Sequence, residues 1–162
     1  MATSTRSRIG AFGALFIAVI LPFVLESPAQ ASTFRDKCTV TPQAPAFENK
    51  FTSRGKKIVN YPIHVQCDGG RDIEIRQQFL ERDIFNGAPV YSTEGQTVAS
   101  HSRTALWGWW LDETIRSERT LPYADTNGDD EVLHKVQFRV KSGGVTGNWT
   151  AWESSPVRSI QH

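Results

Sequence analysis

The sequence predicts an all-β fold, a single antiparallel β-sandwich that follows a cleaved signal peptide. Short candidate strands, separated by turns that contain Gly or Pro, recur at roughly the 8–12-residue spacing of sandwiches and barrels. From His134 to Lys141, residues suited to an inner face alternate with cationic or amide residues, which is the period of two of a strand. A Gly-bearing loop follows this strand, as in a β-hairpin. No stretch has the periodicity of an amphipathic helix of useful length.

Residues 1–31 form a targeting segment rather than part of the fold. Two arginines precede an uncharged, mostly apolar run from Ile9 to Leu25, and Ala29-Gln30-Ala31 has the small-x-small form that signal peptidase cuts. An uncleaved membrane anchor is the alternative, but the run is short for a spanning helix and a cleavage site follows it. We therefore expect a secreted, extracellular protein that begins at Ser32 and has no membrane attachment after cleavage.

Charge balance and cysteine count narrow the class of protein. The chain has 18 Lys and Arg against 17 Asp and Glu, whereas a dedicated nucleic-acid binder carries a basic excess. Its two cysteines, Cys38 and Cys67, predict one disulfide in an exported chain. A metal or redox pair is the alternative, which neither their spacing nor a nearby His supports.

The first half of the exported chain predicts an arm and two strands. Residues 32–46 are rich in Pro and Thr and should form an N-terminal extended arm or edge strand, which Cys38 ties to the β-sandwich domain of residues 47–162. Alternation predicts a strand over Ile58–Cys67, between turns at 55–57 and 68–70. Residues 71–82 have helical as well as strand character, but leading β-branched residues and neighbouring strands favour a strand.

The second half predicts two further strands before the hairpin. A turn is expected at 86–89. Residues 93–103 are polar without apolar periodicity and predict a long loop. Ala105–Leu111 is expected to be a short aromatic strand, and Thr114–Leu121 another. Residues 125–130 should form a loop before the 132–154 hairpin, whose second strand would carry Trp149-Thr150-Ala151-Trp152.

The last third of the chain resembles a fibronectin type III domain. Leu121-Pro122 and an acidic Gly turn precede His134-x-Val136-x-Phe138-x-Val140, which is similar to strand F of that family, and a Gly loop and Trp149 follow. His134 stands where the family has a Tyr, so the usual hydroxyl bond to the backbone is absent. The resemblance implies an immunoglobulin-like β-sandwich, a fold that hosts many functions.

The segment Trp149–Ser154 also resembles the Trp-Ser-x-Trp-Ser box of cytokine-receptor modules with this fold. That resemblance implies a structural cation–π ladder in which Arg139 and Lys141 lie between the rings of Trp149 and Trp152. A guanidinium stacked on an indole face contributes about 0.5–2 kcal/mol.

Trp107, Trp109 and Trp110 are the candidate ligand platform. Flat amphipathic rings stack on sugar faces and mark interfaces. On a strand, however, Trp107 and Trp109 share one face, which we interpret as the inner, buried face. Trp110 points the other way and is the better surface candidate.

The segment 125–131 resembles the start of a calcium-binding loop, because carboxylates and an amide alternate along it. Its Gly is misplaced and position twelve is not Glu, so it is no EF-hand. A solvated acidic turn is the alternative. If a weak calcium site exists, its ligands are Asp125, Asn127, Asp129 and Glu131. No other cofactor is expected.

These observations favour a non-catalytic extracellular binding module that recognises a protein or cell-surface partner. The alternatives are a carbohydrate-binding module that uses the Trp platform, and a small secreted hydrolase inhibitor that inserts residues 93–103. An enzyme is disfavoured, because no Gly-x-Ser-x-Gly motif appears and the adjacent Asp112 and Glu113 would point to opposite faces of a strand.

Overall fold

The structure is a computed structural model that describes residues 32–85, 88–92, 99–106, 108–121 and 129–161. Within these ranges the regular structure is strand, which confirms the predicted all-β fold class. No helix there is long and apolar enough to cross a bilayer. The expected signal peptide lies outside the described residues. The strands are β1 (Thr33–Arg35), β2 (Cys38–Pro42), β3 (Ala46–Phe51), β4 (Lys57–Cys67), β5 (Arg71–Phe85), β6 (Ala88–Ser92), β7 (Ala99–Ala105), β8 (Leu111–Thr120), β9 (Asp130–Ser142), β10 (Val145–Thr146), β11 (Glu153–Ser154) and β12 (Arg158–Ile160).

The first of two antiparallel sheets is organised around β4. Strand β8 pairs with one edge of β4, from Cys67↔Leu111 to Ile58↔Thr120. Strands β2 and β3 pair with successive halves of the other edge, and β1 lies outside β2. The predicted strand over residues 58–67 is therefore the centre of this sheet.

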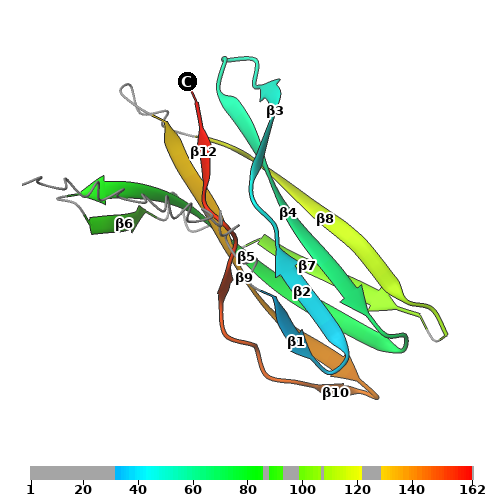
Figure 1. The fold of residues 1–162 in the computed structure, drawn as a ribbon. Helices are drawn as coiled ribbons and strands as arrows, with labels where there is room; N and C mark the ends of the chain where they lie inside the picture. The colour runs from blue at the N-terminus through cyan, green and yellow to red at the C-terminus, as the bar shows by residue number, and fades with distance from the viewer. Residues whose placement is uncertain (1–31, 86–87, 93–98, 107, 122–128, 162) are drawn as a thin grey trace, which may run out of the picture.

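The second sheet is organised around the pair of β5 and β9, which run antiparallel from Asp72↔Lys141 to Glu81↔Val132. Strands β7 and β6 pair with successive parts of the other edge of β5. Strands β10, β11 and β12 pair in the same way with the other edge of β9. Figure 1 shows the two layers, and shows the far end of β5 running with β6 out from the body of the sandwich.

The two sheets bury their alternating apolar residues against each other. Val40, Ile63 and Val65 of the first sheet pack with residues of the second such as Ile73 and Phe138 in one cluster. A second cluster, nearer the other end, contains Val59, Tyr61, Leu121, Val132 and Ile160. The period of two seen in the sequence places these side chains in the core and their neighbours in solvent.

Residues 32–46, which were expected to form an extended arm or edge strand, supply β1 and β2 of the first sheet, with β1 at its edge. Strand β2 lies within the first sheet, between β1 and β4, and Cys38 and Val40 are fully buried. Pro42 ends β2, where the missing N–H interrupts the ladder least.

Two expectations for the middle of the chain are also corrected. Residues 99–103 of the predicted loop belong to β7, while residues 93–98 lie outside the described ranges. The inward side chains of β7 include His101 and Arg103, which bond to other polar groups at the open flank of the sandwich, so the strand has no apolar periodicity. The expected strand over Ala105–Leu111 is wrong: Ala105 ends β7, Leu111 begins β8, and the residues between them connect the two strands. Near the C-terminus, the segment 149–152 is irregular and pairing resumes at β11.

A buried polar network joins the two sheets. The Gln77 side-chain amide on β5 donates to the carbonyl of Tyr61 at 3.0 Å and to Nδ1 of His134 at 2.8 Å. His134 Nε2 in turn donates to the carbonyl of Gln43 at 2.8 Å, so the imidazole is neutral with its proton on Nε2. His101 Nε2 donates to the Gln77 side-chain oxygen at 3.2 Å. The network satisfies polar groups that would otherwise be costly to bury.

We expect this network to make the protein less stable in mild acid. Burial lowers the pKa of His134 from 6.5 to about 4, and burial also lowers the pKa of His101. Between pH 6.5 and about pH 4, His134 is protonated in the unfolded chain but neutral in the folded chain. The free energy of unfolding is therefore highest above pH 6.5 and falls as the pH is lowered towards 4. One such histidine changes the free energy of unfolding by up to about 1.4 kcal/mol per pH unit, and by about 3 kcal/mol over the whole range.

Urea unfolding at several pH values between 7.5 and about 4 measures this slope. The control is His134→Gln, which removes the buried imidazole. In this variant the slope of the free energy of unfolding against pH should be smaller by the contribution of one proton, about 1.4 kcal/mol per pH unit. An equal slope in both proteins would show that His134 does not carry the effect.

Candidate functional site

The connection between β7 and β8 passes from one sheet to the other at the end of the sandwich. Its turn is closed by a hydrogen bond from the Trp109 N–H to the Leu106 carbonyl at 3.1 Å, and Gly108 has a φ of +77°, which favours glycine. Because neither sheet covers this crossover, Trp109 is 72% and Trp110 80% exposed. The surface placement expected for Trp110 is as observed, the buried placement expected for Trp109 is wrong, and Trp107 lies outside the described residues.

Two other exposed apolar side chains lie at the same end of the molecule, which we call the aromatic end. Leu106 lies beside the β9–β10 turn, and Phe34 on β1 shares a surface depression with Trp110. Large apolar side chains that are exposed together mark interaction sites more often than single ones do. The aromatic end consists of Phe34, Leu106, Trp109 and Trp110.

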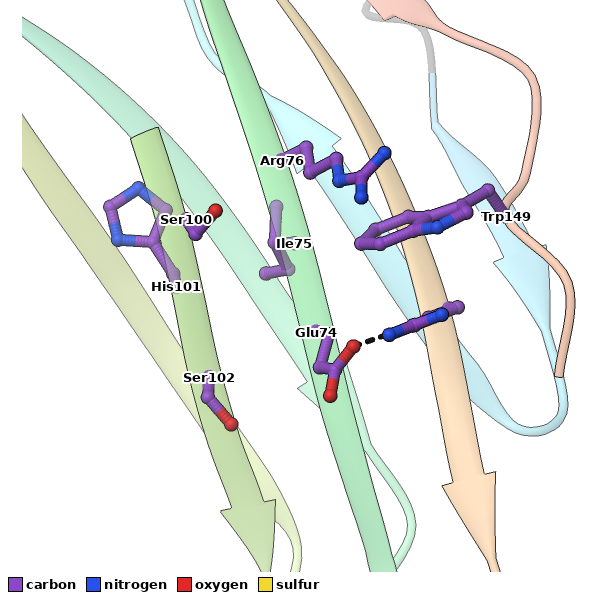
Figure 2. Close-up of a pocket in the computed structure, with 8 residues that line it drawn as sticks. Glu74, Ile75, Arg76, Ser100, His101, Ser102 and Trp149 are labelled. Carbon is purple, nitrogen blue, oxygen red and sulfur yellow. Dashed lines mark hydrogen bonds and ion pairs between the residues drawn. The ribbon is translucent and has the colours of Figure 1, made fainter. Parts of the chain in front are cut away.

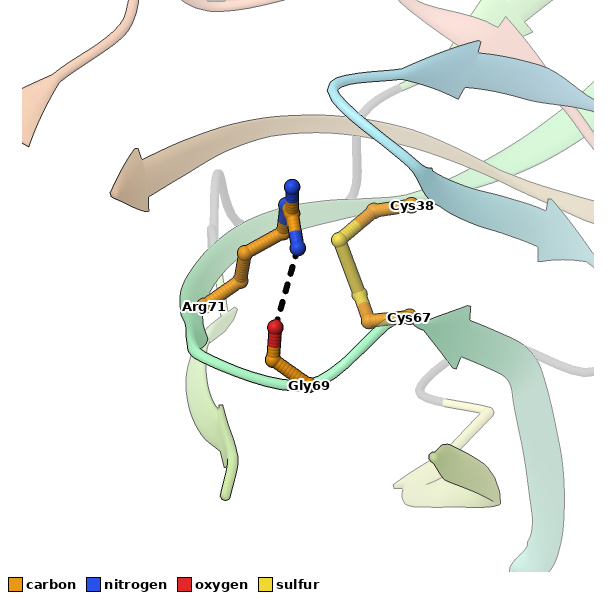
Figure 3. The surroundings of a disulfide bond; sticks show 4 residues. All are labelled: Cys38, Cys67, Gly69 and Arg71. Atoms are coloured by element: carbon orange, nitrogen blue, oxygen red, sulfur yellow. Dashed lines mark hydrogen bonds between the residues drawn. A yellow bond between two sulfur atoms is a disulfide. The ribbon is translucent and has the colours of Figure 1, made fainter. Parts of the chain in front are cut away.

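The loop between β4 and β5, which we call the base loop, lies directly against the turn at residues 106–109. The backbone of Gly69 lies against the 106–109 turn so closely that a Cβ at Gly69 would be 2.5 Å from the Leu106 carbonyl oxygen and 2.8 Å from that of Trp109. Gly70 donates its N–H to the Ala105 carbonyl at 2.7 Å. Figure 3 shows the loop leaving Cys67, with Arg71 donating to the Gly69 carbonyl at 2.9 Å. The base loop therefore fixes the position of the turn at residues 106–109, which we call the Trp turn.

The disulfide predicted between Cys38 and Cys67 is confirmed. The two residues face each other on β2 and β4 and are buried in the larger core cluster. Directly beyond them, the Asp68 N–H donates to the Lys37 carbonyl at 3.0 Å. The disulfide thus joins the strand that carries the base loop to the β1–β2 hairpin that carries Phe34.

We expect Gly69→Ala to displace the Trp turn. The new methyl group would overlap two backbone carbonyls, which cannot rotate away as a side chain can, so the turn must shift. The expected cost is about 1–3 kcal/mol in the free energy of unfolding, with a change in Trp emission. The control is Gly143→Asn, because a side chain there meets nothing and Asn tolerates its φ of +57°. Unchanged stability and emission in Gly69→Ala would contradict the proposed base.

The Trp149 ring lies on the outer face of the second sheet, with two arginines over it. The guanidinium carbons of Arg76 and Arg139 are 4.1 and 4.7 Å from its ring centre. Figure 2 shows the Arg76 side chain along the indole of Trp149, with Glu74 nearby and β7, which carries His101, on the far side of β5. Arg139 also donates to Glu74 at 2.5 Å.

The cation–π ladder implied by the resemblance is therefore only partly formed. Arg139 stacks on Trp149 as that resemblance implies, but the second cation over this ring is Arg76 from β5. Lys141 instead pairs with Glu74 at 2.5 Å, and Trp152 is an exposed residue before β11. The alternate positions of Arg139 and Lys141 were visible in the sequence, whereas the approach of Arg76 depends on the pairing of β5 with β9.

The predicted calcium ligands are divided between described and undescribed parts of the chain. Asp125 and Asn127 lie outside the described residues. The Asp129 carboxylate accepts a hydrogen bond from Ser159 at 2.8 Å, and Glu131 lies 3.5 Å from Arg82. In the ranges that the structure covers, no three His, Cys, Asp or Glu side chains are grouped as metal ligands. The calcium loop stays a prediction.

The inhibitor hypothesis required residues 93–103 to be an inserted loop. Residues 99–103 belong to β7, so this part of the segment is a strand and not a loop.

Sequence reasoning missed Phe34, Leu106 and Gly69. Phe34 stood in the presumed arm, and Leu106 in the presumed aromatic strand. Gly69 was recognised only as a turn residue, because the close approach of the Trp turn is a tertiary contact. The tight run of Trp around Gly108 was the one signal of an exposed turn.

Comparisons with known proteins add little to this picture. No protein-family model matches the chain, and no curated protein matches it. Among solved structures, the sporulation control protein Spo0M from Bacillus subtilis is similar, with a TM-score of 0.37 and 17% sequence identity over 76% of this chain. The chain spans about half of that protein, 48% of its length.

Proposed function

We propose that this chain is a secreted, non-catalytic binding module that recognises an extracellular protein or cell-surface partner through its aromatic end. The observation that carries the proposal is the exposure of Phe34, Leu106, Trp109 and Trp110 at one end of the sandwich, on a base held by Gly69 and the disulfide. Aromatic anchors that are already ordered lose little conformational entropy on binding. Such an end suits recognition rather than bond-making chemistry.

Strand order supports an immunoglobulin-like assignment for this module. Strands β5 and β9 pair in the middle of one sheet with the C-terminal strands at its edge, as C, F and G do in that fold. Strands β4 and β8 pair in the other sheet, in the positions of B and E. The sandwich of such domains presents its loops at two ends, and the aromatic end is one of these.

Secretion is supported by the predicted signal peptide at residues 1–31 and by the disulfide. A disulfide persists in oxidising compartments, so Cys38–Cys67 is compatible with an extracellular location. With both cysteines joined and His134 held in the core network, these residues are structural in the proposed module rather than catalytic.

The test is retention of the labelled protein on arrays of immobilised extracellular proteins and glycans. We expect the wild type to be retained by at least one class, and Trp109→Ala with Trp110→Ala to reduce retention by at least about tenfold, as loss of aromatic anchors does. Trp152→Ala is the matched control, since Trp152 is also exposed but lies beyond the aromatic end. Equal losses in both variants, or no retention of the wild type, would overturn the proposal.

The same variants should fold normally. Removal of an exposed ring changes stability by about 0.5 kcal/mol or less, so we expect Trp110→Ala to unfold at the urea concentration of the wild type. A loss of several kcal/mol would mean that the Trp110 ring is buried, and that it is structural rather than a binding group.

A further inference from the structure

A depression at the aromatic end has two aromatic walls and a polar floor. Phe34 is 70% and Trp110 80% exposed, and they come from elements distant in the sequence, β1 and the β7–β8 turn. The depression has a volume of about 340 Å³, within the range of about 300–1,000 Å³ for small-molecule sites. It is lined by Phe34, Lys37, Thr39, Gln66, Cys67, Asp68 and Trp110.

The floor is built by neighbouring strands in register. Phe34 faces Thr39 across β1 and β2, and Thr39 faces Gln66 across β2 and β4. Gln66 continues the row to Asp112 on β8, to which its side-chain amide donates at 3.1 Å. This bond orients the Gln66 amide, and a hydrogen bond from His64 at 2.7 Å holds Asp112 in turn and lowers its pKa. A row of hydroxyl and amide groups thus lies beside the two rings, already positioned.

The depression has no net charge, which favours an uncharged ligand. Its cation and its anion are paired with each other, because Lys37 Nζ lies 3.6 Å from the Asp68 carboxylate, and the remaining lining groups are uncharged. A sulfated glycan or a nucleic-acid strand would require a cationic excess. An apolar peptide would offer no partner to the Thr39 hydroxyl or to the Gln66 side-chain carbonyl when it covered them, which is costly.

We infer that this depression binds a neutral saccharide, an assignment that rests on the proposed function and names its ligand class. A pyranose ring has faces of C–H groups, which suit the Phe34 and Trp110 rings, and an edge of hydroxyls, which suit Thr39, Gln66 and Asp68. A second row of polar residues lies next to the first on the outer face of the first sheet and consists of Thr41, His64 and Thr114. A linear oligosaccharide therefore has further polar groups to contact, and longer chains bind more tightly.

The test is titration of Trp emission with soluble cello-, chito-, xylo- and malto-oligosaccharides of two to six units. We expect saturable binding of at least one series, with affinity rising with length. Phe34→Ala and Trp110→Ala should each weaken binding at least about tenfold. The matched control is Trp152→Ala, since Trp152 is also exposed but lies beyond the aromatic end and is not among the described residues that line the depression. Calorimetry provides the readout for Trp110→Ala, which removes part of the fluorescence signal.

The other outcomes separate this inference from the proposed function. If no oligosaccharide binds while the array still retains the protein through Trp109 and Trp110 on immobilised proteins, the saccharide assignment is wrong and the binding module stands. If neither glycans nor proteins retain the chain, both are wrong. Co-sedimentation with phosphatidylcholine and phosphatidylserine vesicles that Trp109→Ala abolishes, without saccharide binding, would assign the aromatic end to a lipid surface and overturn the inference.

Discussion

Gln77→Leu lowers the free energy of unfolding by about 2–6 kcal/mol, our expectation for the loss of two hydrogen bonds to buried acceptors. Leu is similar in volume but leaves the Tyr61 carbonyl and Nδ1 of His134 without this donor, in a region that excludes water. Because small domains are stable by only about 5–15 kcal/mol, such a loss leaves the variant marginal at room temperature. Urea unfolding, followed by far-UV circular dichroism, measures the change.

Gln78→Leu is the matched control for this prediction. Gln78 is the next residue on β5, so its side chain points to the opposite face of the sheet and is only partly buried. We expect a change of about 0.5 kcal/mol or less. Equal effects at the two positions would mean that β5 tolerates Leu poorly for another reason, and that the network contributes little.

Removal of the disulfide should have the second large effect. Cys38 and Cys67 are 29 residues apart, and the release of a loop of this length lowers the free energy of unfolding by about 3–4 kcal/mol in the chain-entropy account. Reduced wild type, with both thiols in place, measures this loss alone. Cys38→Ala with Cys67→Ala adds the cost of a cavity in the core, so the double variant should be the less stable of the two.

The disulfide prediction also includes an effect at the aromatic end. The base loop begins directly after Cys67, so loss of the bond should loosen the Trp turn, and Trp emission of the folded reduced protein should move towards that of exposed, mobile indole. Stability that is the same with and without dithiothreitol, under conditions where thiol labelling shows complete reduction, would contradict the expected contribution.

The predicted strands that match the structure are those whose two faces differ in polarity. In β4 and β9, apolar and polar residues alternate through most of the strand, because one face meets the opposite sheet and the other meets solvent. Strand β7 has no such contrast: its inner positions hold His101 and Arg103, whose partners Gln77 and Glu113 come from other strands. No local pattern identifies a polar side chain as inward when its partners are distant in the sequence.

The sequence predicted an exposed Trp site but not which residues form it. Trp110 was expected at the surface, yet the core was expected to hold Trp109, because the run from Ala105 to Leu111 was interpreted as one strand. A chain that crosses between sheets has no inner face, so alternation has no meaning there. Phe34 joins the site only through the register of β1, β2 and β4.

By itself, the sequence determined the all-β class, the central strands and the single disulfide, since local alternation and the count of cysteines are sufficient for these. Tertiary structure alone decided that Gly69 supports the Trp turn, that Arg76 stacks on Trp149, and that Phe34 and Trp110 share one depression. The physical reason is that periodicity reports how each residue faces its own sheet. Contacts at the ends of a sandwich depend instead on the pairing and packing of strands that are far apart in the chain.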